Sequence, residues 1–564
     1  METLVRRFEE AVRDRPASGR APAAAPRIDP GRIGDPVLLG RLHDAALFLR
    51  AFPRTRQDVA AAERILGRFP ARMEALSRRG ADLAGLDRFE TVGIGGTSLT
   101  MDFSWGMARW LARRHAGAVS IAWDEVAKPE RLAPALSRAL PFLSERALAD
   151  AGVDYAEWLR AALPPGARDG GLRFLVDLFE ANGDDDDRAE RWDPLGLTIR
   201  WALGASPASR TLARLPAGLF VDAAPLVTRR DVSIERECRG AAPRIRWLSS
   251  ARGRAFLDAA RAAVAVRYRE LHAFTWGHPA DVVVADAGRG LAIWCCGLRP
   301  EQRLPLRAGF GFLLARNGVP VGYGDAYALG DRLDLSFNVF YAFRDGESAF
   351  AYARTVAFFR ALLGTRAVAV DPYQIGKGND EAIASGAFWF YRKLGFRSSA
   401  PPLEAAARRE EALSASRPGR RTSAATLRRI TAAGLRLDLP GAAPSAWGAV
   451  SLDAAGLAAE HRRTAAGGSP VTFRQAREKR VARALGLFPD ALPPRLARAL
   501  RGLAPVLDLV PGLARLRADE RAALRDLVVL KAGRSEAAFA RALARAGRLA
   551  AAMDRAGRRA AARR

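Results

Sequence analysis

The clearest hydrophobic pattern runs from residue 254 to residue 399, where segments of strand type alternate with turn residues. After a helical stretch, residues 282–296 and 311–329 each predict a β-hairpin. The first hairpin is expected to turn around Ala287-Gly288. The second contains Asn317-Gly318, a dipeptide that strongly favours a two-residue hairpin turn. The pattern therefore predicts an antiparallel meander in the middle of the chain.

Two further strands and a helix are predicted next. Residues 333–343 indicate one long strand and residues 366–373 a second. Between them, residues 350–363 have helical spacing, and Gly364 is a plausible helix stop. The apolar stripe of this helix has steps of four, three and four residues and consists of Tyr352, Val356, Phe359 and Leu363. A helix between two strands is typical of a mixed sheet flanked by helices.

The N-terminal part is organised differently. Residues 36–86 predict a helical hairpin, and residues 90–125 a unit of βαβ type with strands at 90–96 and 117–124 around a helix at 104–114. The sequence GIGGTS within this unit predicts a tight turn with positive φ. A phosphate cradle at a helix start is the alternative.

Four consecutive aspartates, residues 184–187, predict an exposed acidic loop. A Mg²⁺ or Ca²⁺ site is the alternative, because carboxylate oxygens suit these ions. No Cys/His spacing resembles a zinc site, and we expect no metal cofactor.

The chain is thus expected to have an α/β (α+β) fold with an additional N-terminal α/β region and a C-terminal all-helical region. The predicted segments are a loose arm and helical hairpin at 1–89, an α/β region of unknown family at 90–250, the mixed-sheet domain at 251–400, a charged helix and linker at 401–449, and a helical domain with a basic tail at 450–564.

Charge changes this picture less than its size suggests. The 564 residues include 89 Lys and Arg against 61 Asp and Glu, a net charge of +28. Such an excess is typical of nucleic-acid binding. Only five of the basic residues are lysines, however, and alanine is abundant. This composition indicates that much of the positive charge reflects a general bias toward arginine and lies on a solvated surface.

The chain begins without an apolar signal core, and no apolar run approaches the roughly 18 residues of a membrane span. Its three cysteines do not form a disulfide framework. We therefore expect a soluble, cytoplasmic protein without a membrane span. Its oligomeric state stays open.

Residues 309–398 resemble the GNAT superfamily of N-acetyltransferases. The segment GAFWFYRKLGF, residues 386–396, is similar to the closing helix-to-strand signature of that family, and RDGESA, residues 344–349, lies where its pyrophosphate loop lies. The order of strands and helices is also similar. The resemblance implies a transferase that moves an acyl group from acyl-CoA, typically acetyl-CoA, to a small-molecule or peptide amine.

The loop has a physical rationale of its own. A Gly-containing turn that opens a helix presents backbone N–H groups and a helix dipole to phosphate. In the family pattern Arg344 takes the first position and Ala349 the last, and a local shift would let Gly346 and Ser348 contact the pyrophosphate. Glu347 stands where a glycine is expected, and a carboxylate beside a pyrophosphate is unfavourable.

The resemblance implies further site residues. Tyr391 would protonate the departing CoA thiolate, and Asn379 would contact CoA at the start of the closing helix, although the gap between them is longer than usual. Lys377, one of the five lysines, lies between two glycines and would contact substrate. An alternative for Tyr391 is a packing role.

Acyl transfer to an amine also needs a group that takes the amine proton. Asp371 is the first candidate, and the other carboxylates are Asp325 and Asp334. His272 and His278 are chemically suitable, although structural roles suit them better. Backbone N–H groups near Asn338–Tyr341 would polarise the thioester carbonyl.

Two alternatives keep the fold and change the function. A GNAT-like transferase that uses aminoacyl-tRNA as donor would explain the basic surface. A degenerate, non-catalytic GNAT-like scaffold would explain Glu347 and the long gap before Tyr391.

Overall fold

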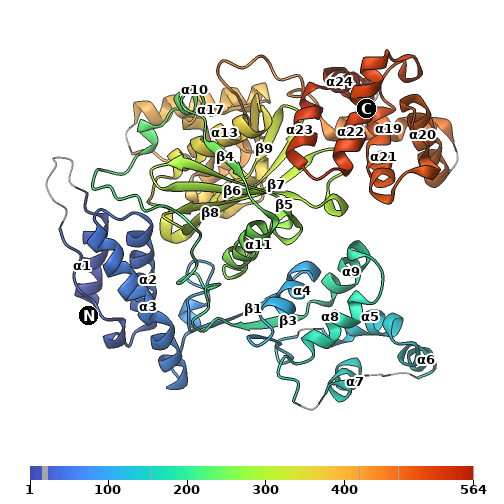
Figure 1. Ribbon diagram of the computed structural model, residues 1–564. Helices are drawn as coiled ribbons and strands as arrows, with labels where there is room; N and C mark the ends of the chain where they lie inside the picture. Colours follow the sequence, from blue (N-terminus) through green and yellow to red (C-terminus); the bar gives the residue numbers. More distant parts are fainter. Residues whose placement is uncertain are drawn as a thin grey trace. The chain divides into compact units, whose positions relative to one another are not determined.

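The computed structural model describes residues 1–562 except 16–22, 127, 151, 153, 165, 418 and 468. It divides into two compact units. The first comprises Met1–Pro225, Phe256–Thr275 and Asn317–Pro320, and the second comprises Leu226–Ala255, Trp276–Arg316 and Val321–Arg564. The fold is mixed α/β, as predicted, with helices and strands in both units (Figure 1).

The first unit contains a helical part and a small sheet. Its helices are α1 (Glu2–Arg13), α2 (Pro36–Ala51), α3 (Arg56–Arg78), α4 (Trp105–Arg114), α5 (Leu132–Ala139), α6 (Pro141–Ala149), α7 (Tyr155–Ala162), α8 (Leu172–Glu180), α9 (Asp185–Trp192) and α12 (His272–Thr275). The predicted hairpin is confirmed as α2 and α3. A capping box between Thr55 and Asp58 begins α3.

The small sheet has the order β1-β3-β2, with β1 at Ser98–Asp102, β3 at Thr198–Ala202 and β2 at Val119–Ile121. Strand β3 is antiparallel to both neighbours. The prediction of a strand at 90–96 is wrong, because the strand begins only at Ser98. The backbone of the preceding segment packs closely against other parts of the first unit. A Cβ on Gly93 would lie 2.1 Å from the backbone oxygen of Val266, and one on Gly96 would lie 2.2 Å from that of Pro70.

The GIGGTS segment is accordingly the predicted tight turn. Gly93 and Gly96 have φ of +90° and +86°. The N–H of Gly95 donates to Thr211 Oγ1 at 2.8 Å and that of Gly96 to Gly204 O at 2.7 Å. Since these donors are used within the first unit, they do not form a phosphate cradle.

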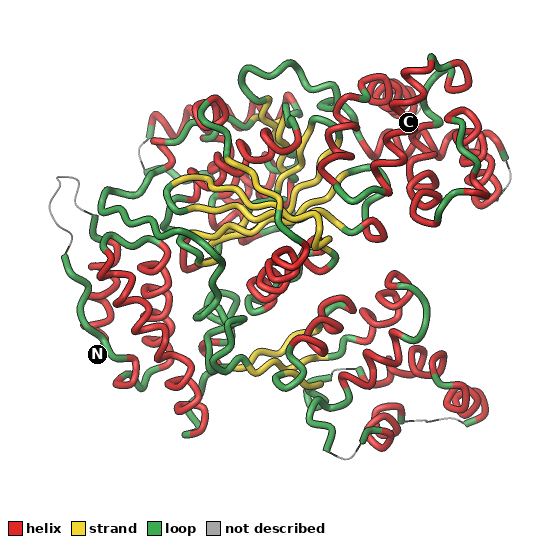
Figure 2. Tube along the Cα trace, viewed as in Figure 1, coloured by secondary structure: helices red, strands yellow, loops and turns green. Residues whose placement is uncertain are grey.

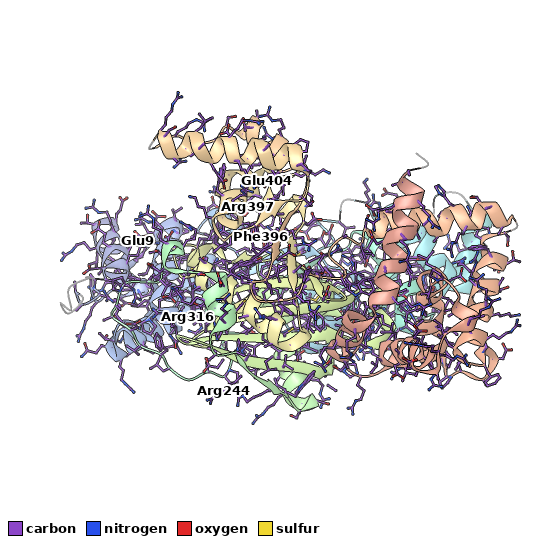
Figure 3. All side chains as sticks on the ribbon, turned by 90° about the horizontal axis from the view of Figure 1, so that it is seen from above. Glu9, Arg244, Arg316, Phe396, Arg397 and Glu404 are labelled. Atoms are coloured by element: carbon purple, nitrogen blue, oxygen red, sulfur yellow. The ribbon has the colours of Figure 1, made fainter. Side chains whose placement is uncertain are left out.

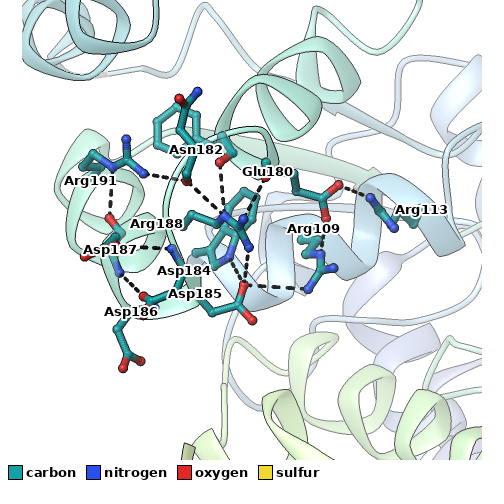
Figure 4. A network of polar contacts seen from close by, with 12 residues as sticks. Arg109, Arg113, Glu180, Asn182, Asp184, Asp185, Asp186, Asp187, Arg188 and Arg191 are labelled. Atoms are coloured by element: carbon teal, nitrogen blue, oxygen red, sulfur yellow. Dashed lines mark hydrogen bonds and ion pairs between the residues drawn. The ribbon is translucent and has the colours of Figure 1, made fainter. Parts of the chain in front are cut away.

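The acidic run 184–187 is the beginning of α9 rather than a loop, which corrects the prediction (Figure 4). Asp184 accepts hydrogen bonds from the N–H groups of Asp186 and Asp187 at 2.9 and 3.0 Å. Asp185 pairs with Arg188 at 3.2 Å. Acidic residues favour a helix N-terminus because they offset the positive end of the helix dipole.

The second unit is built on a ten-stranded sheet (Figure 2). Nine strands follow the order β12-β13-β11-β9-β8-β7-β6-β5-β4, and β10 pairs with β8. Their bounds are β4 (Arg244–Trp247), β5 (Gly277–Gly288), β6 (Leu291–Leu298), β7 (Ala308–Arg316), β8 (Val319–Leu329), β9 (Arg332–Leu335), β10 (Asn338–Val339), β11 (Ala367–Val370), β12 (Arg397–Ser398) and β13 (Leu435–Asp438).

The two predicted hairpins differ in outcome. The turn at Asn317-Gly318 is confirmed, with φ of +49° and +80°. The other hairpin turns at Arg289-Gly290 instead of Ala287-Gly288, because Gly288 still pairs with Leu291. Both turn residues there have positive φ, as a type I′ turn requires, although arginine rarely adopts that conformation.

Helices accompany this sheet. They are α10 (Ile234–Arg239), α13 (Ser348–Leu363), α14 (Pro372–Ile375), α15 (Asp380–Ser385), α16 (Ala387–Lys393), α17 (Pro401–Ser416) and α18 (Ala424–Ile430), while α11 (Ser250–Ala265) spans the boundary between the units. The stripe predicted for α13 is confirmed as fully buried, and Gly364 ends the helix with φ of +75°.

The segment 401–449, predicted as a charged helix and linker, supplies α17, α18 and strand β13. Strand β13 lies between β11 and β12. Glu404 on α17 lies close to Arg397 on β12 (Figure 3), and the N–H of Ser398 donates to its carboxylate at 2.9 Å. This segment therefore belongs to the sheet.

The C-terminal segment is helical, as predicted. Its helices are α19 (Leu452–Ala466), α20 (Pro470–Leu485), α21 (Pro494–Leu507), α22 (Ala518–Ala532), α23 (Glu536–Arg545) and α24 (Gly547–Ala561). Helix α23 joins the sheet through a buried charge cluster of Asp281, Arg303, Lys531 and Glu536. In it, Gly309 N–H donates to Glu536 Oε1 at 3.0 Å and Glu536 N–H donates to Asp281 Oδ2 at 2.8 Å.

Candidate functional site

The candidate site lies where two parallel strands of the large sheet part. Strand β9 pairs with β11 only from Arg332 to Asp334. The chain then breaks, so that the strand predicted at 333–343 becomes β9, the short β10 and a 3₁₀ turn at Tyr341–Phe343. Beyond Leu335 the chain still pairs with β8, but it no longer pairs with β11 on its other edge.

The direction of the backbone N–H groups at this edge follows from the pairing. Ser336 and Phe340 donate to Asp325 O and Val321 O on β8, at 2.9 and 3.0 Å. Because alternate N–H groups of a strand point to opposite sides, the N–H groups of Phe337 and Val339 point away from β8. The N–H of the predicted substrate-binding residue Asn338 faces β8, so Val339 is the better donor for a substrate oxygen.

Helix α13 begins beside this edge. Its first backbone N–H groups belong to Ser348, Ala349 and Phe350, and the N-cap residue Glu347 does not cap them with its side chain. None of the three donors has a partner among the described residues. Gly346, by contrast, donates its N–H to Phe343 O at 2.9 Å. An uncapped helix start of this kind favours an anion.

Glu347 is held away from these donors. Its carboxylate is 2% exposed and accepts three hydrogen bonds from Arg289, the closest at 2.7 Å, one from Arg316, and one from the N–H of Val227 at 3.0 Å. Burial alone would raise the pKa of Glu347, but the two guanidiniums hold it below its usual value. The expected conflict between this carboxylate and a phosphate is therefore reduced, because its charge is offset locally.

Arg344 lies at the same loop and is exposed. Its guanidinium stacks 3.7 Å from the ring centre of Tyr341 and donates to Glu381 at 2.8 Å. The hydroxyl of Tyr341 donates to the same carboxylate at 2.6 Å. These contacts link the loop before α13 to helix α15, which follows β11. An incoming phosphate would compete with Glu381 for Arg344.

Tyr391 belongs to an aromatic cluster on α16, α13 and the strand break. Its ring centre lies 5.4 Å from that of Tyr352, which in turn lies 5.1 Å from that of Phe337. Burial raises the pKa of Tyr391, so its hydroxyl keeps its proton at neutral pH. No described residue forms a hydrogen bond with that hydroxyl. The geometry allows both the packing role and the role of a proton donor.

Sequence reasoning missed a second hydroxyl in this cluster. Tyr352 was identified only as part of a helical stripe, yet its buried hydroxyl has no hydrogen-bond partner among the described residues. Burial and the neighbouring Tyr391 raise its pKa well above the usual value. A buried polar group in a predicted apolar stripe was the only sequence signal.

The residues after β11 have local structural roles. Asp371 accepts from the N–H of Tyr373 at 2.8 Å and begins α14. Asn379 accepts from the N–H of Ala382 at 3.1 Å and begins α15. Lys377 is exposed between them. The long gap before Tyr391 is explained by Gly386, whose φ of +71° separates α15 from α16.

Asp325 is the carboxylate best suited to take a proton. Its side chain accepts from the Ser336 hydroxyl at 2.5 Å, and burial raises its pKa. Burial and the neighbouring Asp325 raise the pKa of Tyr327 to about 12. Asp334 is instead paired with Arg307 and Arg332, each at 3.3 Å.

The two histidines do not join this site. His278 accepts a hydrogen bond at Nδ1 from the N–H of Ala280 at 3.0 Å, which is a local structural role, and burial lowers its pKa. His272 is exposed and belongs to the first unit. The described part of the chain contains no group of three or more His, Cys, Asp or Glu side chains arranged to hold a metal ion.

Comparison with known proteins adds no relative. No family model, no curated protein and no solved structure matches this chain. Among the residues that the structure describes, no helix has both the length and the apolar character that a bilayer span requires.

Proposed function

We propose that the second unit is an acyltransferase of GNAT type that moves an acyl group from acyl-CoA to an amine. The observation that carries the proposal is the meeting of three features where β9 and β11 part. These are the uncapped start of α13, the outward N–H of Val339 and the aromatic cluster around Tyr391. The proposal covers this site alone and leaves the acceptor open.

The proposed reaction is direct attack. The diphosphate of CoA would lie at the N–H groups of Ser348 to Phe350, and Val339 would donate to the thioester carbonyl. The amine nitrogen forms the new bond to the carbonyl carbon while the carbon–sulfur bond breaks. Tyr391 gives its proton to the departing thiolate, and Asp325 takes the amine proton, directly or through water.

The pairing of Glu347 favours this reading over a degenerate scaffold. A carboxylate free to face the loop would repel a diphosphate. Here the carboxylate is instead engaged by Arg289 and Arg316. The departure from the family pattern thus has a structural role that leaves the helix start open to an anion.

The first test is acetyl-CoA binding to the full chain by isothermal titration. Ser348→Glu places a carboxylate in the first turn of α13, where it does not harm the helix but repels a diphosphate. We expect at least a tenfold loss of affinity, whereas Ser416→Glu on the exposed end of α17 should change nothing. Equal binding by both variants would contradict a diphosphate site at the start of α13.

The second test addresses chemistry. Tyr391→Phe should slow acyl transfer by about 10- to 100-fold while leaving acetyl-CoA affinity unchanged, because only the proton donor is lost. Tyr373→Phe, an exposed tyrosine, is the matched control. Absence of acetyl-CoA binding together with binding of aminoacyl-tRNA would replace this proposal by the tRNA-dependent alternative.

A further inference from the structure

A second candidate site lies in the C-terminal helices, far along the chain from the residues discussed above. An open surface pocket is formed between α19, α20 and α21. Four arginines, one phenylalanine and one aspartate dominate its lining: Arg462, Arg474, Arg477, Arg501, Phe473 and Asp508. No step of the acyl-transfer proposal uses these residues.

The positive charge of this pocket exceeds what its acids offset. Asp508 is 3% exposed and pairs with three arginines, namely Arg462 at 3.6 Å and both Arg477 and Arg480 more closely. One carboxylate can neutralise only one of them. Burial and the neighbours Arg480 and Arg462 lower the pKa of Arg477, which is the direction expected for crowded positive charges.

The two remaining arginines of the lining add to this excess. Arg501 has Glu478 as its acid, at 3.7 Å. Arg474 donates to the backbone oxygen of Pro470 at 3.3 Å, and the described residues provide it with no ion pair. Guanidiniums of this kind keep N–H donors available for a ligand, and their planar fork matches phosphate oxygens.

The surroundings strengthen the electrostatic argument. Residues 450–564 contain 24 Lys and Arg against 10 Asp and Glu, a net charge of +14, which is half of the total on about a fifth of the chain. The excess charge is therefore concentrated in the segment of the chain that forms the pocket. Such a field raises the local concentration of anions.

The pocket also offers a flat apolar surface. The guanidinium of Arg477 lies 4.4 Å from the ring centre of Phe473, and the rest of the lining is apolar. Aromatic rings and guanidinium planes are the surfaces on which nucleic-acid bases stack. We propose that this pocket binds a nucleotide, with its phosphate on Arg462, Arg474 and Arg501 and its base against Phe473 and Arg477.

The test uses the full chain and three probes: inorganic phosphate, AMP and a short single-stranded RNA. Binding is measured by titration calorimetry at several salt concentrations. We expect AMP to bind more tightly than phosphate. RNA that binds no better than AMP identifies a free nucleotide as the ligand. RNA that binds much more tightly identifies single-stranded RNA as the ligand. Either outcome supports nucleotide binding by the pocket. Inorganic phosphate that equals AMP would overturn the base contact, and no binding by any probe would overturn the proposal.

Variants localise the effect. Arg474→Ala with Arg501→Ala leaves the pairs of Asp508 intact and should weaken AMP or RNA binding at least tenfold, with a reduced salt dependence. The control is Arg555→Ala with Arg559→Ala, which removes the same charge from exposed positions on α24. Equal losses in both double variants would contradict a pocket. Asp508→Asn should instead raise affinity several-fold, because it removes the competing carboxylate.

Discussion

Glu347 and Asp508 are each a buried acid held by arginines, and they differ in what surrounds them. Glu347 has two arginines, with side chains 4% and 27% exposed, and a backbone N–H. Asp508 has three arginines, two of which are 42% and 56% exposed. The acids are equally buried. The number and exposure of the cations therefore decide whether such a cluster only stabilises the fold or also offers charge to a ligand.

The cluster of Asp281, Arg303, Lys531 and Glu536 is a third case. It has two acids and two bases, and Arg303, Lys531 and Glu536 are almost completely buried. Lys531 donates to Arg307 O at 2.9 Å, and Arg303 donates to Lys531 O at 2.7 Å. This balanced cluster joins the C-terminal helices to the sheet and leaves little charge for a ligand.

Glu347→Gln should have the largest effect on stability. Removing the acid leaves the guanidiniums of Arg289 and Arg316 inside the protein without their counter-charge, which typically costs about 3–5 kcal/mol. Urea unfolding measures the loss. The control is Glu235→Gln, whose exposed pair with Arg239 should contribute less than about 1 kcal/mol. Similar losses in both variants would contradict the expectation that Glu347 neutralises buried guanidiniums.

The pH dependence of the balanced cluster should be the next largest effect. Burial raises the pKa of Asp281 to about 6. Between about pH 4 and pH 6 the folded state therefore binds more protons than the unfolded state, and stability falls as pH rises, by on the order of 2 kcal/mol. Asp281→Asn should flatten this slope in unfolding experiments across that range. If stability still fell with pH to the same extent in this variant, groups other than Asp281 would cause the dependence.

Asp508→Asn should have the smallest effect on stability, about 1–2 kcal/mol, because the exposed arginines around it can be rehydrated. Their mutual repulsion is screened by salt, so the loss should shrink as NaCl is raised. The loss caused by Glu347→Gln should shrink less, since Arg316 is buried and Arg289 is less exposed than the outer arginines of Asp508. Equal salt responses of the two variants would contradict the proposed difference in solvent exposure between the arginines around Asp508 and those around Glu347.

Local parts of the fold were predictable because neighbouring residues determine them. The turn at Asn317-Gly318 and the buried stripe and Gly364 stop of α13 follow from residue types that favour one backbone conformation. The β5–β6 turn was misplaced because Arg289 rarely takes a positive φ, and its side chain is held there by Glu347, 58 positions away. Strand β13 was missed although Leu435–Asp438 alternates apolar and polar residues, because a run of four residues is short and lies in a charged, Arg-rich segment.

The candidate site was predictable only in part. The positions of the loop and of Tyr391 follow from the resemblance, but the partners of Glu347 and the outward N–H of Val339 depend on pairing across the sheet. The cap roles of Asp371 and Asn379 are local, because each side chain accepts from an N–H group two or three residues further on. The arginine pocket was invisible because its lining residues come from three helices and are separated by ordinary surface positions.

The sequence by itself determined the mixed α/β class, the principal helices and the strand-rich centre, because hydrophobic period and turn chemistry act over a few residues. It also determined the net charge of +28. Only the tertiary structure decided where that charge is offset and where it is not. Ion pairs form between residues that are distant in the chain, and burial, which only the folded chain creates, makes those pairs strong enough to matter.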